Sequence, residues 1–159
     1  MMAELKPRPE LLALAHHAAH AHSLWPELVC AVVEQESAWN PWALRYEPSF
    51  YARYVQPQIT SGSLTSETEA RARAFSWGLM QVMGQVAREH GFAASSLAAL
   101  CEPAVGLDVG CRVLAAKLAA AEGNVGRALL LWNGGGNRGY SAAVLARTAH
   151  YKPPDAAAV

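Results

Sequence analysis

The stretch PELVCAVVEQESAWNP, residues 26–41, contains the strongest structural signal in this chain. Proline suits the first turn of a helix, because the backbone N–H that it lacks is not needed there. The residue before a proline is instead pushed toward extended geometry. These two rules predict a helix that begins at Pro26 and ends before Asn40 and Pro41.

Glu36 lies on the apolar face of this predicted helix. At about 100° per residue, the same face carries Val29, Val32 and Val33. An ionised carboxylate loses hydration in such surroundings, so we expect the pKa of Glu36 to be raised. A carboxylic acid that stays protonated near neutral pH can act as a general acid. Periodicity alone also allows a structural glutamate, whose charge is balanced by a buried partner or stays in contact with water at the edge of a groove.

Helices are predicted for most of the remaining chain, where apolar residues recur with helical spacing. The capping-box pattern at residues 66–69 indicates a helix start, Pro103 suits a first turn and Asn124 is a favourable N-cap. Residues 41–63 mix proline, glycine, serine and aromatic residues and predict an irregular segment with one helical turn. We expect the further helices at about residues 9–22, 66–73, 79–90, 103–123, 124–132 and 140–150.

These elements predict a single all-α domain, α+β at most, with a minor irregular or hairpin lobe. The 159 residues are 52% hydrophobic and only 16% charged, which is enough apolar material for one compact core. We expect one domain over residues 1–159, with its core at about 9–151. An inserted lobe is expected at about 42–75, and a loose tail at 153–159.

Composition narrows the possible partners. Thirteen lysine and arginine residues balance thirteen aspartate and glutamate residues, so no overall field favours nucleic acid. No run of about eighteen apolar residues could cross a membrane, and the first residues lack the pattern of a signal peptide. We therefore expect a monomer that is synthesised in the cytoplasm, with no nucleic-acid partner and no integral membrane association.

Neither the cysteines nor the histidines have a convincing metal-site spacing. Cys30, Cys101 and Cys111 match no zinc motif and form no even disulfide set, so we expect reduced thiols. His16 and His20 share a helix face at a spacing that can bind zinc, but no acidic or cysteine partner accompanies them. We expect a polar surface helix there, and no metal or other cofactor.

Five sequence blocks, in order, resemble the motifs of the soluble lytic transglycosylase family, the goose-type-lysozyme-like branch of the lysozyme superfamily. They are QESAWNP at residues 35–41, SWGLMQVM at 76–83, a helix that opens at Pro103, WNGG at 132–135, and a last helix that contains Tyr140. Together they cover about residues 28–151. The first two blocks are the most specific.

This resemblance implies a lysozyme-like fold and an enzyme that acts on peptidoglycan glycan strands. The cleaved bond would be the β-1,4 link between N-acetylmuramic acid (MurNAc) and N-acetylglucosamine (GlcNAc), with 1,6-anhydro-MurNAc ends as products. Glu36 would be the catalytic acid and base. The implied substrate-binding residues are Ser37, Gln81, Met83, Trp132, Asn133 and Tyr140.

Several of these residues also have a simpler interpretation. Met83, taken alone, is more typical of core packing than of a groove. Ser37 could either steady the carboxylate or satisfy a helical carbonyl. Trp132 stands where the family has a tyrosine; it can stack on a sugar but cannot donate a hydroxyl hydrogen bond. For Tyr151, in the following segment, we expect hydrophobic packing.

The inserted residues 42–77 raise an alternative reaction. The segment Arg45–Tyr51 is similar to a short stretch of some phage-type muramidases, and it supplies Glu47 as a second carboxylate, which otherwise would be a solvated loop residue. A muramidase uses two carboxylates for hydrolysis. A non-catalytic glycan-binding module is a further alternative. A compact single domain without a signal-peptide pattern also suggests action on the cell wall after release from the cytoplasm, in phage lysis or on a virion.

Overall fold

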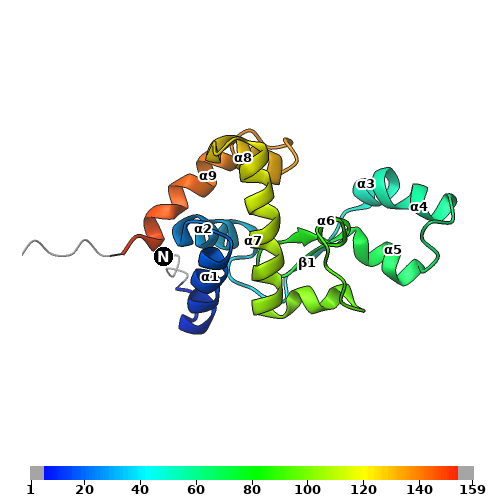
Figure 1. Ribbon diagram of the computed structural model, residues 1–159, viewed down its shortest axis with the longest axis horizontal. Coiled ribbons are helices and arrows are strands. Elements are labelled where there is room, and N and C mark those ends of the chain that lie inside the picture. The colour runs from blue at the N-terminus through cyan, green and yellow to red at the C-terminus, as the bar shows by residue number, and fades with distance from the viewer. Residues whose placement is uncertain (1–5, 154–159) are drawn as a thin grey trace, which may run out of the picture.

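The computed structural model describes residues 6–153. Five helices form a body on one side, and a smaller lobe extends away from it (Figure 1). The body helices are α1 (Pro9–Ala21), α2 (Pro26–Ser37), α7 (Pro103–Ala120), α8 (Val125–Trp132) and α9 (Tyr140–Arg147), followed by the 3-10 turn η3 (Thr148–Tyr151). The mostly helical fold that the sequence predicts is confirmed.

Helix starts follow the predicted signals. Pro26 and Pro103 occupy first-turn positions of their helices, where no backbone N–H is lost. The Asn124 side chain accepts a hydrogen bond from the Arg127 backbone N–H, and Ser66 caps α5 (Glu67–Arg73) in the same way. These caps satisfy N–H groups that have no partner inside the helix.

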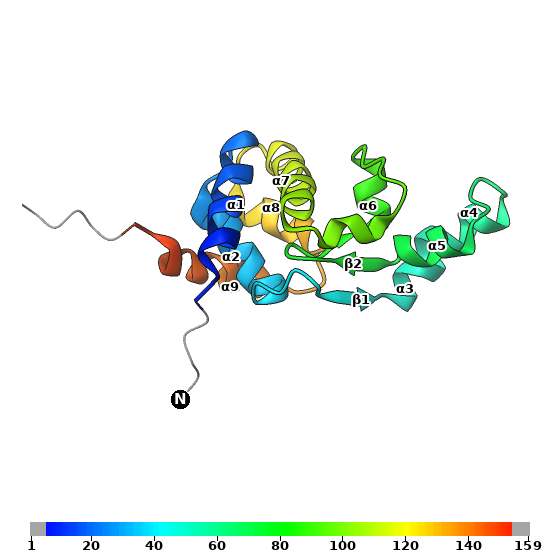
Figure 2. The ribbon, with the colours of Figure 1, turned by 90° about the horizontal axis from the view of Figure 1, so that it is seen from below.

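A small antiparallel sheet joins the body to the lobe (Figure 2). Its strands, in spatial order, are β1 (Leu44–Tyr46), β2 (Phe75–Trp77) and β3 (Val82–Met83). Arg45 pairs with Ser76, and Ser76 pairs with Met83. Because facing residues in a sheet project to the same side, these three side chains share one face. The minor hairpin allowed by the sequence is therefore present.

The prediction of a continuous helix over residues 79–90 is wrong. The helix α6 spans only Gly84–Glu89, and the residues before it form the turn and strand of the sheet. Gly78 and Gln81 have positive φ angles of 67° and 50°, which no right-handed helix contains. A side chain at Gly78 would also bring a Cβ within 2.5 Å of the Leu100 carbonyl oxygen. Close packing against the short 3-10 turn η2 (Leu97–Cys101) thus overrides the helical pattern.

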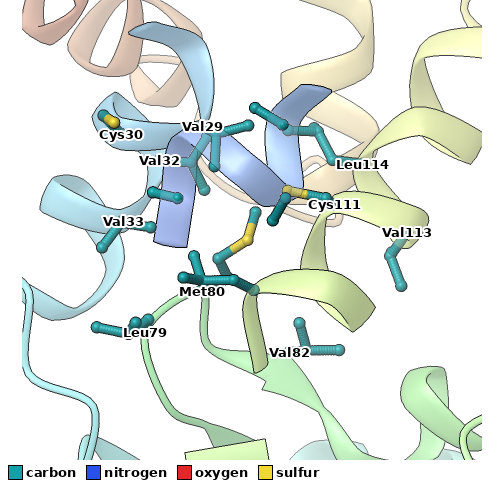
Figure 3. Close-up of a cluster of buried hydrophobic side chains, with 14 of the residues drawn as sticks. Val29, Cys30, Val32, Val33, Leu79, Met80, Val82, Cys111, Val113 and Leu114 are labelled. Carbon is teal, nitrogen blue, oxygen red and sulfur yellow. The ribbon is translucent and has the colours of Figure 1, made fainter. Parts of the chain in front are cut away.

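The core surrounds α2, whose residues from Leu28 to Val33 are buried (Figure 3). Met80 and Leu79, from the turn before β3, pack beneath these valines. Gly110 of α7 admits the Met80 thioether, because any Cβ there would collide with it. Burial on several sides stabilises α2 in its position, and it fixes the direction of the last turn of this helix.

The lobe has its own small apolar cluster and more helix than the sequence predicts. Val55, Ala70 and Ala74 are buried at its centre. Partly buried apolar and aromatic side chains pack around them: Tyr46, Phe50, Tyr51, Ile59 and Leu64. Instead of one helical turn, the segment contains α3 (Pro48–Phe50), the short π-helix η1 (Tyr51–Val55) and α4 (Gln56–Thr60). This packing explains how a segment with irregular composition keeps a defined shape.

Cys30, Cys101 and Cys111 are buried free thiols in the described structure, and burial raises the pKa of Cys30 to about 12. Within residues 6–153, no helix is both long and apolar enough for a membrane span. Over the same residues, no group of three potential metal ligands comes together. The tail expected at residues 153–159 lies, apart from Pro153, outside the described residues.

Candidate active site

Glu36 lies in the last turn of α2 and lines a groove of about 740 Å³ between the body and the lobe. The lobe and sheet contribute Arg45, Glu47, Phe50 and Tyr54, whereas the body contributes α7 and α8 residues. The lining combines charged and polar side chains with apolar and aromatic ones, and a concave site of this kind is where a ligand is expected to bind.

Two donors from the body contact one oxygen of Glu36. The Trp132 indole N–H donates a hydrogen bond of 3.1 Å to Oε1, and the Tyr140 hydroxyl donates to the same atom. The other oxygen, Oε2, accepts no hydrogen bond from residues 6–153. It is also not among the buried atoms that lack a partner, so it remains accessible. Glu36 is therefore oriented through Oε1, and Oε2 is left accessible without a hydrogen bond from the described residues.

Burial is the main influence on the pKa of Glu36, and it raises that pKa above the ordinary value of 4.5. Removing a carboxylate from water disfavours its charged form. The hydrogen bonds from Tyr140 and Trp132, and the positive charge of Arg45, lower the pKa but do not cancel the effect of burial. A carboxyl group with a raised pKa is better suited to act as a proton donor than an ordinary glutamate is.

The Ser37 hydroxyl binds backbone carbonyls and does not contact the Glu36 carboxylate. It donates to the Val33 carbonyl at 3.1 Å and to the Leu79 carbonyl at 2.8 Å. It thereby links the end of α2 to the turn before β3. It lies outside the residues that line the groove, so this geometry gives no support to a substrate-binding role.

Both polar atoms of the Gln81 side chain form hydrogen bonds within the protein. Its amide nitrogen donates to the Ala43 and Gly78 carbonyls, both at 3.0 Å. Its Oε1 accepts a hydrogen bond of 2.8 Å from the Ser76 hydroxyl. Gln81 also lines the groove. The structure therefore gives it a scaffolding function, and its contact with a sugar stays a prediction.

The remaining predicted residues divide into groove-lining and buried positions. Met83, Trp132 and Asn133 line the groove, so their positions allow contact with a bound glycan. Tyr140 is buried behind Glu36, with 4% of its surface exposed. Burial and the neighbouring Glu36 raise the pKa of Tyr140, so the phenol stays a hydrogen-bond donor.

Glu47 also lines the groove, but its carboxylate has a partner. Arg45 Nε lies 2.6 Å from Glu47 Oε1. The two residues flank the end of β1, and the Glu47 side chain is one-third exposed. The Glu47 carboxylate is therefore engaged in a largely exposed ion pair at the edge of the groove.

Sequence reasoning missed several groove residues. Gln85 and Glu89 of α6, and Val113 and Lys117 of α7, line it as pairs four residues apart. Such pairs lie on one helix face, so the spacing was a usable signal, although it did not indicate which face meets the groove. Tyr54 lies on the short π-helix η1, and no sequence pattern considered above predicts such a helix.

The expectation of hydrophobic packing for Tyr151 is only partly right. Its ring packs against the core, at 5.9 Å from the ring of Trp39. Its hydroxyl accepts a hydrogen bond of 2.8 Å from the Trp39 indole and donates one of 2.5 Å to Glu34. Tyr151 thus belongs to a polar cluster.

Comparisons with known proteins give one informative match. Neither the curated proteins nor the solved structures include a significant match to this chain. A family model described as "Transglycosylase SLT domain" matches residues 13–150, a span that includes α2, the sheet, the lobe and α9. Members of this family are enzymes that act on peptidoglycan. The chain belongs to the transglycosylase SLT domain family, and it is an enzyme of the peptidoglycan lytic transglycosylase type.

Proposed function

We propose that this protein cleaves the MurNAc–GlcNAc β-1,4 bond of peptidoglycan by lytic transglycosylation, with Glu36 as both general acid and general base. The observation that carries this proposal is the arrangement around Glu36. Its carboxyl group is buried and has a raised pKa, it is oriented through Oε1, and it lines the groove.

In the first step, protonated Glu36 acts as the acid. Because Tyr140 and Trp132 donate to Oε1, the transferable proton is best placed on Oε2. Transfer of that proton to the glycosidic oxygen lets the bond between this oxygen and C1 of MurNAc break. GlcNAc leaves as an alcohol, and positive charge develops on the MurNAc ring. The groove needs no metal for this step.

In the second step, the resulting Glu36 carboxylate acts as the base. It takes the proton from the 6-hydroxyl of the same MurNAc, whose oxygen then forms a bond to C1. This closes the 1,6-anhydro ring and restores protonated Glu36. The two hydrogen bonds to Oε1 stabilise the carboxylate between the steps, since hydrogen bonds to an ionised group are stronger than those to a neutral one.

Hydrolysis is the second candidate, and the position of Glu47 favours it. Glu47 lines the same groove as Glu36 and could activate water or attack the sugar, as second carboxylates do in glycosidases. Its ion pair with Arg45 argues against this role, because the guanidinium competes with water and with the sugar for the Glu47 carboxylate. We therefore favour the one-carboxylate reaction.

The mass of the released muropeptides distinguishes these candidates. Purified peptidoglycan digested by the enzyme should give MurNAc ends that are lighter by one water than reducing ends. Glu47→Gln should digest the same substrate at nearly the wild-type rate. Reducing MurNAc ends together with an inactive, folded Glu47→Gln variant would instead establish a two-carboxylate muramidase.

A further inference from the structure

A second polar cluster surrounds Glu34, two residues before the groove-facing carboxylate. Glu34 Oε2 accepts a hydrogen bond of 2.5 Å from the Tyr151 hydroxyl and lies 3.0 Å from His150 Nδ1. Arg147 Nε lies 3.5 Å from Glu34 Oε1. The Tyr151 hydroxyl in turn accepts a hydrogen bond of 2.8 Å from the Trp39 indole. Only 19% of the Glu34 side chain is exposed, so these contacts replace most of its hydration.

A carboxylate at this position of α2 needs such compensation. The carboxyl end of a helix carries partial negative charge, which disfavours an acidic residue nearby, and the last turn of α2 contains no basic residue. Burial also opposes ionisation of Glu34. Hydrogen bonds from Tyr151 and His150, with the charges of His150 and Arg147, nevertheless hold its pKa below 4.5. All three partners come from the segment that includes α9 and η3.

The same segment supplies a donor to Glu36. Tyr140 is the first residue of α9, and Arg147 is the last. The helix packs against α2 (Figure 1), with its first residue on Glu36 and its last turn on Glu34. The α9–η3 segment is therefore attached to the catalytic helix at both ends through two neighbouring carboxylates.

We propose that Glu34 is a positioning residue for the reaction: it holds the α9–η3 segment so that the Tyr140 hydroxyl stays on Glu36 Oε1. This inference rests on the proposed function of Glu36. Without Glu34, the C-terminal end of α9 loses its hydrogen-bonded anchor. Displacements of about 1 Å at catalytic groups can cost about 100-fold in rate, so a small shift of Tyr140 is enough to matter.

A double-mutant cycle between Glu34 and Tyr140 tests this coupling. Each of Glu34→Ala and Tyr140→Phe should lower kcat on purified peptidoglycan about 10-fold, with KM changed less than about twofold. If both act through the same hydroxyl, the double variant should be no slower than the slower single variant. The alkaline limb of the kcat profile should move to higher pH in both, because the Tyr140 hydrogen bond lowers the pKa of Glu36.

Two variants separate positioning from a general loss of stability. Glu34→Gln keeps an oxygen that can accept the Tyr151 hydrogen bond, and it should recover most of kcat. Asp108→Ala is the matched control, since this carboxylate is also held by a histidine and an arginine, His22 at 2.7 Å and Arg112 at 2.9 Å. It should leave the pH profile unchanged. If Glu34→Ala does not fold, Tyr151→Phe removes the same hydrogen bond and keeps the ring.

Three results would overturn the inference: a folded Glu34→Ala with wild-type kcat, losses that add in the double variant, or a Tyr140→Phe variant with wild-type activity and pH profile. These outcomes are distinct from a failure of the proposed function. If Glu36→Gln is inactive while the cycle is additive, only the positioning role is rejected. If Glu36→Gln stays active, the proposed function itself is wrong.

Discussion

The indole N–H of Trp132 donates a hydrogen bond of 3.1 Å to Glu36 Oε1. Trp132 occupies the position at which the family motif has a tyrosine, and here its indole N–H is a donor toward the carboxyl group. The same side chain lines the groove, and its ring therefore remains available for stacking on a sugar. One residue thus combines a hydrogen bond to Glu36 with a position on the wall of the groove.

Trp132→Phe keeps an aromatic ring but removes the donor. We expect kcat to fall about 10-fold, because a hydrogen bond to a charged group contributes about 1.5 kcal/mol. The effect on KM should be small if the ring still stacks. Initial rates of turbidity loss on purified cell walls give both values. Trp42→Phe, at an exposed tryptophan outside the groove lining, is the control; equal losses in both variants would contradict the donor role.

Gln81→Ala tests the scaffolding role of this glutamine. The substitution removes the partner of the Ser76 hydroxyl and of two carbonyls. We expect the free energy of unfolding in urea to fall by about 1–3 kcal/mol. The exposed Gln56→Ala should change it by less than about 0.5 kcal/mol; a similar, small change for both would mean that the Gln81 contacts are not needed for the fold.

The raised pKa of Glu36 predicts a stability difference that depends on pH. A carboxyl group whose folded pKa exceeds its unfolded value stabilises the fold below the unfolded value, and this contribution is lost as pH rises through the folded pKa. Glu36→Gln is neutral at all pH values. The Tm difference between Glu36→Gln and the wild type should therefore grow as the pH rises above 4.5, and the variant should have the higher Tm at pH 7. Each 1 kcal/mol of added stability corresponds to about 2–4 °C in Tm. Thermal unfolding at both pH values checks this, and a gain that is larger in acid would contradict it.

Much of the fold follows from local signals. Pro26, Pro103 and Asn124 begin helices where their own chemistry places them, because first-turn and capping effects depend only on nearby backbone. The helix predicted over residues 79–90 failed for a non-local reason. Gly78 packs against the Leu100 carbonyl, and Met83 pairs across the sheet with Ser76. No periodicity within residues 79–90 contains this information.

In the candidate site, too, local features could be predicted from the sequence and tertiary contacts could not. The position of Glu36 on an apolar helix face was visible in the sequence, and its burial followed. The motif residues also indicated which segments meet at the groove. The partner of each side chain could not be predicted: Gln81 donates to the carbonyls of Gly78 and of the distant Ala43, and Tyr151 contacts Glu34 although the two are far apart in the sequence. Such contacts depend on how α9 and η3 return to α2, which only the tertiary structure determines.

Glu36→Gln tests the central claim most directly, and the measurement is the initial rate of turbidity loss of purified cell walls. The glutamine preserves the shape of the side chain and an acceptor for Tyr140 and Trp132, but it cannot donate and recover a proton in the same way. With the fold verified by circular dichroism, the account predicts a rate lower by about 10²–10⁴, the usual contribution of general acid–base catalysis. A folded Glu36→Gln protein that clears cell walls at nearly the wild-type rate would contradict it.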